Sequence, residues 1–350
     1  MEIFLGEPNN EEIKEYVRTL QTRDNLCIRT YYSPDPLIFS YIISKYIKNK
    51  TFITFKSSCD LELKQDSNGK WIIDNTIKKH YYLGNNAFSS YLVINNDDIL
   101  AILTGVISST IIERRRLSEW ELSVIKSLEQ FGVIIEKNLR VPNFKALPLF
   151  LSLMLSLDPF IPTISGNREN SINLMKEINA NETTKLEDLD ENQLNTLLYR
   201  VISLIIKENP KFNRDDIITD RIFYLDYDTL ELSFSLIYSF DTFGSGEIAQ
   251  FVTTPSYAEV LLDKFRSTLG KGFSLQLQNA TKSYYIVNTN NFNSPLLTQL
   301  ILLQLQKIKR DKTVVLKIGN NYYTSSYFEQ SRRSEGLIKI DDRVKNENTV

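Results

Sequence analysis

Residues 26–47 constrain the fold more than any other stretch of the 350-residue chain. The first six of these residues are mostly apolar or β-branched, which is typical of a buried strand. Ser-Pro-Asp-Pro at 33–36 then breaks the run, and proline is favoured in the first turn of a helix. Apolar residues recur at helical spacing over 37–45. The stretch predicts a strand, a tight polar turn and a helix. The plainest interpretation is an ordinary βα unit, although ligands bind at the carboxyl ends of such strands in open α/β sheets.

Length and charge limit the possible functions. A chain of 350 residues is long enough for two domains with separate cores. It carries 41 basic and 43 acidic side chains, for a net charge of −2. A protein that coats DNA regardless of sequence would be strongly basic, so the balance argues against that class. A local basic groove is still compatible with this balance of charges.

The cysteine and histidine content excludes several kinds of site. Cys27 and Cys59 are too few for a disulfide framework and lie in no Cys-x-x-Cys motif, so we expect free thiols in a reducing compartment. His80 is the only histidine, which argues against a zinc site, a Cys–His dyad and a Ser–His–Asp triad. Neither a signal peptide nor a membrane span is evident. We therefore expect a cytoplasmic protein with no cofactor.

The rest of the chain alternates between strand and helix patterns, with a polar joint at 208–216. Ser118 and Glu121 form a capping-box pattern before a helix that runs to about residue 132. Residues 100–112 fit either one helix or a strand followed by a helix. We expect the remaining helices at 11–20, 37–48, 147–157, 186–206, 256–269 and 295–306. We expect strands at 51–55, 61–73 (a hairpin), 79–83, 90–94, 221–225, 230–238, 273–277, 283–287 and 313–318.

Two polar segments in the first half allow more than one interpretation. Asn95-Asn96-Asp97 follows the expected strand 90–94 and would be, by itself, an Asx-rich turn. The arginines at 114–116 could contact phosphate, or could lie in a solvated loop or a partner contact.

The strand ends resemble degenerate metal-binding motifs of the DHH phosphoesterases, the RecJ family. The first family motif is Asp-x-Asp-Gly after a strand, where this chain has the Ser-Pro-Asp-Pro turn. The family's later Asp-His-His corresponds to 95–97, and its Asp-x-Gly corresponds to 82–84, where only the glycine is kept. The positions that match the family's metal ligands are Ser33, Asp35, Leu83, Asn95, Asn96 and Asp97. From the alternation of strands and helices we expect the turns at 33–35 and 95–97 to meet at the carboxyl edge of the sheet.

A block in the middle of the chain resembles the archaeal RecJ-like proteins in particular. Those proteins have an Asp-Pro-Phe element followed by Pro and Gly, and then an acidic stretch that opens a helix. Here Asp158-Pro159-Phe160, Pro162, Gly166 and the acidic stretch Asp188-Leu189-Asp190-Glu191 occur in that order and spacing. The block contains no chemistry of its own, so it indicates lineage rather than activity.

The last third resembles the DHH-associated substrate domain. Residues 323–326 or 331–334 lie where that domain has a Ser-Arg-Ser strand. The enzymes close this domain with a Gly-Gly-Gly-His turn that holds phosphate, and this chain instead ends in the polar tail 341–350, which we expect to be disordered. The candidate nucleic-acid contacts are Ser325, Ser326, Arg332 and Arg333.

The resemblance implies an α/β fold with a mostly parallel DHH sheet, a helical connector and a smaller α/β domain. Two-metal hydrolysis needs several carboxylates and imidazoles around cations about 3.5–4 Å apart, which Asp35 and Asp97 cannot supply alone. The implied function is a non-catalytic RecJ-like subunit of the CMG replicative helicase that binds GINS and links it to Mcm. Any binding of single-stranded DNA should be weak and salt-sensitive, because the net charge is slightly negative. The alternatives are a single-strand nuclease or nucleotide phosphodiesterase with an atypical metal site, and an orphan single-strand binder. The expected divisions are 1–145 (DHH domain), 146–212 (connector), 213–340 (associated domain) and 341–350 (tail).

Overall fold

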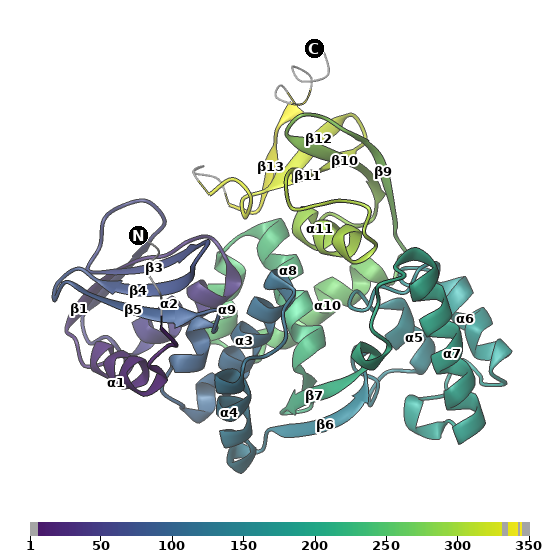
Figure 1. Cartoon of the computed structure of the whole chain (residues 1–350), viewed down its shortest axis with the longest axis horizontal. Coiled ribbons are helices and arrows are strands. Elements are labelled where there is room, and N and C mark those ends of the chain that lie inside the picture. Colours follow the sequence, from purple (N-terminus) through teal and green to yellow (C-terminus); the bar gives the residue numbers. More distant parts are fainter. Residues whose placement is uncertain (1–5, 331–334, 342–343, 345–350) are drawn as a thin grey trace. The chain divides into compact units, whose positions relative to one another are not determined.

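The computed structural model describes residues 6–330, 335–341 and 344 (Figure 1). The chain forms two compact units, each assembled from segments that are separate in sequence. The division expected at residues 145, 212 and 340 stays a prediction, and most of the expected tail lies outside the described residues. The first unit comprises 1–133, 243–258 and 329–333, and the second comprises 134–242, 259–328 and 334–350.

The sheet of the first unit has the strand order β2-β1-β3-β4-β5. β1 is parallel to β2 and β3, whereas β3, β4 and β5 pair antiparallel. The prediction of a mostly parallel sheet is therefore wrong. Parallel neighbours need a crossover of a dozen or more residues, and the short connections after β3 and β4 allow only hairpins. The strands are β1 (Asn25–Arg29), β2 (Lys50–Thr54), β3 (Leu61–Asp66), β4 (Gly69–Asp74) and β5 (Lys79–Gly84).

Helices cover one face of this sheet, and side chains alternate accordingly. Leu26 and Ile28 point into the core, whereas Asn25 and Arg29 are exposed. α2 packs against α3 and α9, so it is buried along most of its length. The helices of this unit are α1 (Asn10–Leu20), α2 (Pro34–Tyr46), α3 (Ile99–Glu113), α4 (Glu119–Ser127) and α9 (Gly246–Thr253), with the short turns η1 (Phe88–Tyr91), η2 (Asn96–Asp98) and η3 (Glu129–Phe131).

Two predicted strands are helical in the structure. Residues 90–94 are not a strand, because the chain at 88–91 forms the 3₁₀ turn η1. Residues 230–238 belong to the helix α8 (Thr229–Phe243). Their period-two alternation of apolar and polar residues is typical of a half-buried strand. In the structure the polar members Glu231, Ser233 and Ser235 are buried as well, so the alternation does not separate an inner from an outer face.

The expectation of two free thiols is also wrong. Cys27 on β1 and Cys59, just before β3, form a disulfide. β1 pairs with β3 at Ile28 and Leu61, which brings the two cysteines to a Cα separation of 5.0 Å. The sequence gives no sign of this pairing, because it depends on which strands are neighbours in the sheet.

The second unit has a helical core beside a small antiparallel sheet, β6-β7-β8. Apolar residues of α5, α6 and α7 form its main cluster, which includes Leu153, Leu174 and Leu197. Gly166, in the block that resembles RecJ-like proteins, has a positive φ of 73°, and a Cβ there would lie 2.5 Å from the Phe273 ring. The elements are β6 (Ile134–Leu139), α5 (Leu149–Met154), α6 (Arg168–Glu177), η4 (Leu186–Asp188), α7 (Glu191–Glu208), η5 (Arg214–Ile217), β7 (Ile218–Tyr224) and β8 (Tyr227–Asp228).

A second five-stranded sheet of this unit has the order β13-β12-β11-β10-β9. β10 and β11 are parallel and are connected through α11, whereas the other pairs are antiparallel. One face packs on residues such as Leu302 and Ile308. On the other face, Ile338 of the sheet clusters with Ile340 and Val344, which follow β13. The elements are α10 (Tyr257–Leu269), β9 (Ser274–Ala280), β10 (Tyr284–Asn290), α11 (Pro295–Gln304), β11 (Thr313–Ile318), β12 (Asn321–Ser325) and β13 (Leu337–Lys339).

Candidate functional site

Asp35 lies at the start of α2, where the sequence predicts the turn after the first strand. Ser33 is the N-cap residue of α2 and has an extended backbone conformation. The prolines on either side of Asp35, at 34 and 36, fall in the first turn of the helix. Proline fits there because its missing N–H would have no helical partner. Asp35 is 2% exposed, so its carboxylate points into the protein rather than into solvent.

The Asp35 carboxylate holds the η1 turn. Its two oxygens accept hydrogen bonds from the backbone N–H of Phe88 at 2.8 Å and of Ser89 at 2.9 Å. A Cβ on Gly105 of α3 would lie 2.4 Å from the Ser89 hydroxyl oxygen, so α3 packs closely on the same turn. The one acid retained from the first DHH-like motif is therefore occupied by protein groups.

A buried lysine provides positive charge next to Asp35. Burial raises the pKa of Asp35 above its ordinary value, while the positive charge of Lys70 and the N–H groups of Ser89 and Phe88 oppose that shift. Lys70 is 1% exposed and its ammonium lies 2.5 Å from the Glu113 carboxylate and 2.7 Å from the Ser109 hydroxyl. An internal cation, held by the protein's own side chains, thus accompanies the retained acid.

Arg115 belongs to the same internal network. Its guanidinium donates two hydrogen bonds to Glu121, at 2.6 and 2.7 Å, and a third to Glu113 at 2.7 Å. Glu121 is fully buried and also accepts from the backbone N–H of Ala87 and Ser118. Such bidentate pairs to a buried carboxylate are strong and directional. This arginine of the 114–116 run therefore has a structural contact and is not a phosphate ligand in this arrangement.

The structure does not bring the two DHH-like turns together. Asn95 donates from its side-chain amide to the Tyr46 hydroxyl at 2.9 Å, and Lys45 and Tyr46 both bind Asp98. These residues lie at the C-terminal end of α2, whereas Asp35 lies at its N-terminal end. At about 1.5 Å per residue, the 13-residue helix separates the two ends by roughly 20 Å.

The prediction that both turns meet at the carboxyl edge of the sheet is therefore wrong. The reason is the missing strand at 90–94: without it, residues 95–97 do not follow a strand end. Asn95 instead accepts from the backbone N–H of Asp97 and caps η2. Leu83, the third position matched to the metal motifs, is a fully buried core residue of β5.

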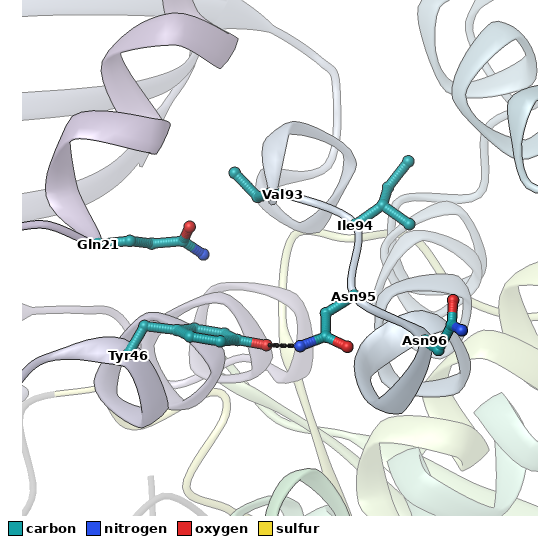
Figure 2. A pocket seen from close by; sticks show the side chains of 6 residues that line it. All are labelled: Gln21, Tyr46, Val93, Ile94, Asn95 and Asn96. Carbon is teal, nitrogen blue, oxygen red and sulfur yellow. Dashed lines mark hydrogen bonds between the residues drawn. The ribbon is translucent and has the colours of Figure 1, made fainter.

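A pocket of about 370 Å³ opens beside Asn95 (Figure 2). Figure 2 shows Asn95 hydrogen-bonded to the Tyr46 hydroxyl, with no carboxylate or cation among the residues drawn. Burial, followed by the neighbouring Asp98 carboxylate, raises the pKa of Tyr46 to about 12. The lining favours an uncharged group over a metal ion. It consists of Gln21, Tyr46, Val93, Ile94, Asn95 and Asn96.

The candidate nucleic-acid residues of the second unit are buried where the structure describes them. Ser325 and Ser326 are 0% and 3% exposed. The Ser325 hydroxyl accepts from the backbone N–H of Tyr327, and the Ser326 hydroxyl donates to a carbonyl oxygen. Neither hydroxyl can reach a nucleic acid in this conformation, so these two candidates are corrected. Arg332 and Arg333 lie outside the described residues.

Sequence reasoning missed Lys70, although the strand pattern contained a signal. Lys70, Ile72 and Asp74 alternate with Trp71 and Ile73 along β4. Since Ile72 is core, its period-two neighbours Lys70 and Asp74 must also face inward. An inward lysine on a strand requires a buried acid, and Glu113 supplies it.

Across the described ranges, no group of three or more His, Cys, Asp or Glu side chains is placed to hold a metal ion. In the same ranges, no helix is both long enough and apolar enough to cross a membrane. The site around Asp35 is therefore an internal hydrogen-bond and ion-pair network built on a βα turn.

Comparison with known proteins shows which family has this fold. A model of the archaeal Cdc45 family matches residues 1–343. The chain belongs to the archaeal Cdc45 family. This assignment confirms the predicted RecJ-like, DHH-related lineage.

A crystal structure of CDC45 from Entamoeba histolytica is similar in fold, with a TM-score of 0.57. The similarity covers 97% of this chain and 98% of that chain, at 8% sequence identity. A search of curated protein sequences gives no match. The fold is therefore Cdc45-like over nearly its whole length, although very few residues are shared.

Proposed function

We propose that this protein is a non-catalytic subunit of the CMG replicative helicase that binds GINS and links it to the Mcm ring. The observation that carries the proposal is the family match over residues 1–343. Members of a family defined by Cdc45 act in DNA replication as a part of this helicase. We place the protein at the nucleoid, in the cytoplasm, for the same reason.

The geometry around Asp35 supports a scaffold rather than a nuclease. Both carboxylate oxygens of Asp35 accept backbone N–H groups, so neither is directed at solvent. Lys70 and Arg115 supply two positive charges to the same interior. Two cations would have to compete with these bonded groups, and no second carboxylate or imidazole cluster stands nearby among the described residues.

Reconstitution with purified archaeal GINS tests the proposal. Size-exclusion chromatography with light scattering should show a stable complex, because a specific interface buries on the order of 1,200–2,000 Å². The negative control is protein that has been denatured and, after removal of the denaturant, shows no melting transition and is therefore not folded. Separate elution of the two proteins at near-physiological salt would contradict the proposed role.

The same preparation should be tested for hydrolysis of single-stranded DNA, RNA and nucleotides. Turnover that depends on Asp35, together with separate elution from GINS, would favour the phosphodiesterase alternative. Absence of both GINS binding and hydrolysis would favour an orphan single-strand binder.

A further inference from the structure

The disulfide between Cys27 and Cys59 has no role in the proposed scaffold. These two residues are the only cysteines of the chain, so no third thiol of the same chain competes for either sulfur atom. The contacts around them show that the fold, and not the bond alone, keeps the two residues together.

Hydrogen bonds hold the two cysteines side by side without involving their sulfur atoms. The Cys27 backbone N–H donates to the Asp60 carboxylate at 3.0 Å. The Asn75 side-chain amide donates to the Cys59 carbonyl oxygen at 2.7 Å, and the Asn75 backbone N–H donates to the Asp60 carbonyl oxygen at 2.8 Å. β1 and β3 also pair directly. These contacts keep the two thiols neighbours after reduction, so the bond can form again in the folded protein.

One sulfur atom of the pair is accessible to a reagent in solution. Along β1 the side chains alternate between the core and the solvent. Cys27 lies on the solvent side with Asn25 and Arg29 and is half-buried, whereas Cys59 is 7% exposed. An attacking thiolate therefore reaches the Cys27 sulfur first. Exposed disulfides are the labile and regulatory ones, whereas structural disulfides resist reduction.

The disulfide encloses a segment that contains α2 and the edge strand β2. The two cysteines are 32 residues apart in sequence. β2 is the last strand of its sheet and pairs with β1. Phe52 of β2 is in register with Cys27, and its side chain is 62% exposed, so it contributes little packing. Elements with few buried apolar contacts open most readily, and a crosslink across such a loop restricts the open states.

We propose that Cys27 and Cys59 form a reversible redox switch that controls the opening of β2. In reduction, a thiolate of a dithiol attacks the Cys27 sulfur, the S–S bond breaks, and the Cys59 sulfur leaves as a thiolate and takes up a proton. The second thiol of the reagent attacks the mixed disulfide and releases Cys27 as a thiol. The protein gains two electrons and two protons, and the dithiol becomes a cyclic disulfide.

Oxidation reverses these steps. A low-molecular-weight disulfide accepts the two electrons and two protons from the protein and becomes two thiols, while the bond between the cysteines forms again. The switch belongs to the fold of the first unit and does not depend on the proposed replication role.

The first test is incubation of the folded full chain with dithiothreitol, without denaturant, followed by alkylation with a maleimide and mass spectrometry. We expect no maleimide on the oxidised protein and one on each cysteine after reduction. Removal of dithiothreitol and addition of oxidised glutathione should restore the intramolecular disulfide. The restored protein should then carry neither maleimide nor glutathione.

Hydrogen exchange measures the consequence for β2. Reduction should raise the exchange rates of the amides at 50–54 by about tenfold, because the crosslink no longer restricts the open state. The amides of β10 and β11 in the second unit are the internal control, and their exchange rates should not change. The melting temperature of the reduced protein should be lower for the same reason.

Two variants complete the design. Cys27→Ser/Cys59→Ser keeps the side chains similar in size but cannot form the bond. Its β2 amides should exchange like those of the reduced protein, both in dithiothreitol and in oxidised glutathione. Ser58→Ala is the matched control, since it alters an exposed side chain just before Cys59 and keeps the disulfide. It should respond to both reagents as the unaltered protein does.

Reduction that requires denaturant would overturn the inference, because the disulfide would then be a permanent structural bond. Thiols that stay free, or stay capped by glutathione, under oxidising conditions would overturn it as well. So would equal exchange rates of the β2 amides in the two redox states of the unaltered protein. These results concern the sulfur atoms and β2 alone, so they are distinguishable from a failure of GINS binding, which is measured separately.

Discussion

The carboxylate of Asp35 accepts the backbone N–H of Ser89 at 2.9 Å, across 54 residues of sequence. This bond, with its neighbour from Phe88, fastens the start of α2 to the turn that leads into α3. Asp35 matches a metal-ligand position in a family of phosphoesterases, but in this protein its carboxylate stabilises the fold. Removal of the carboxylate should therefore lower the free energy of unfolding.

Asp35→Ala leaves two buried N–H groups without acceptors. Each unsatisfied buried donor costs about 1–3 kcal/mol, so we expect the free energy of unfolding to fall by about 3 kcal/mol. Denaturant unfolding followed by circular dichroism measures the change. Asp97→Ala removes an exposed carboxylate and should have little effect. An Asp35→Ala variant as stable as the unaltered protein would mean that the two bonds contribute nothing.

The protein should not hydrolyse nucleic acids. We expect no release of product from single-stranded DNA, RNA or short oligonucleotides with Mg²⁺ or Mn²⁺, because Asp35 is engaged and residues 95–97 lie at the other end of α2. Product release above the protein-free control, abolished by Asp35→Ala in a folded variant and kept in Asp311→Asn at an exposed position elsewhere, would contradict this prediction.

Lys70→Met should destabilise the fold. The substitution keeps the length of the side chain but leaves Glu113 without its 2.5 Å partner and Asp35 without a nearby positive charge. Removing one member of a buried ion pair costs on the order of 3 kcal/mol. Lys64→Met on the neighbouring strand β3 is the control, since its side chain is 56% exposed. Equal midpoints of thermal unfolding for the two variants would argue against an internal role for Lys70.

Asp241 should make stability depend on pH. Burial raises its pKa to about 6 even though it accepts hydrogen bonds from Ser294 and from the Leu296 N–H. Between the ordinary value of 3.8 and about 6, the folded state holds a proton that the unfolded state has released. This contribution is full below pH 3.8 and is lost as the pH rises through about 6, a change of about 3 kcal/mol.

The check for Asp241 is the difference in unfolding free energy between the unaltered protein and Asp241→Asn, measured from pH 4 to 7. The difference should shift in favour of the variant as the pH rises. Asp311→Asn, at an exposed position, should give no such trend. A constant difference for Asp241→Asn over that range would refute the raised pKa.

Local signals in the sequence predicted much of the fold. The prolines at 34 and 36 begin α2, and Ser118 with Glu121 forms the expected capping box of α4. Such features depend on neighbours within a few residues. The turn at 88–91 could not be predicted in the same way, because its N–H groups are held by Asp35 from a distant part of the chain. The apolar residues that follow it are equally typical of a strand.

The candidate site shows the same division. Asp35 could be found from its place after a strand, and Lys70 from the alternation along β4. The contact of Asp98 with Lys45 and Tyr46 could not, since it depends on how α3 starts beside the end of α2. The sequence resemblance identified the family correctly but placed residues 95–97 wrongly at the end of a strand. Related proteins keep the overall fold more strongly than they keep the local structure around a site whose residues have been replaced.

Recovery of partners from a native extract tests the central proposal most directly. The tagged full chain should be captured at near-physiological salt and its partners identified by mass spectrometry. We expect GINS and Mcm subunits to be enriched over a capture with an unrelated tagged protein of similar net charge. An Asp97→Ala capture should give the same partners, because that variant alters one exposed side chain and leaves the fold intact. If neither GINS nor Mcm is recovered, while the captured protein remains folded, the chain is not the helicase scaffold proposed here.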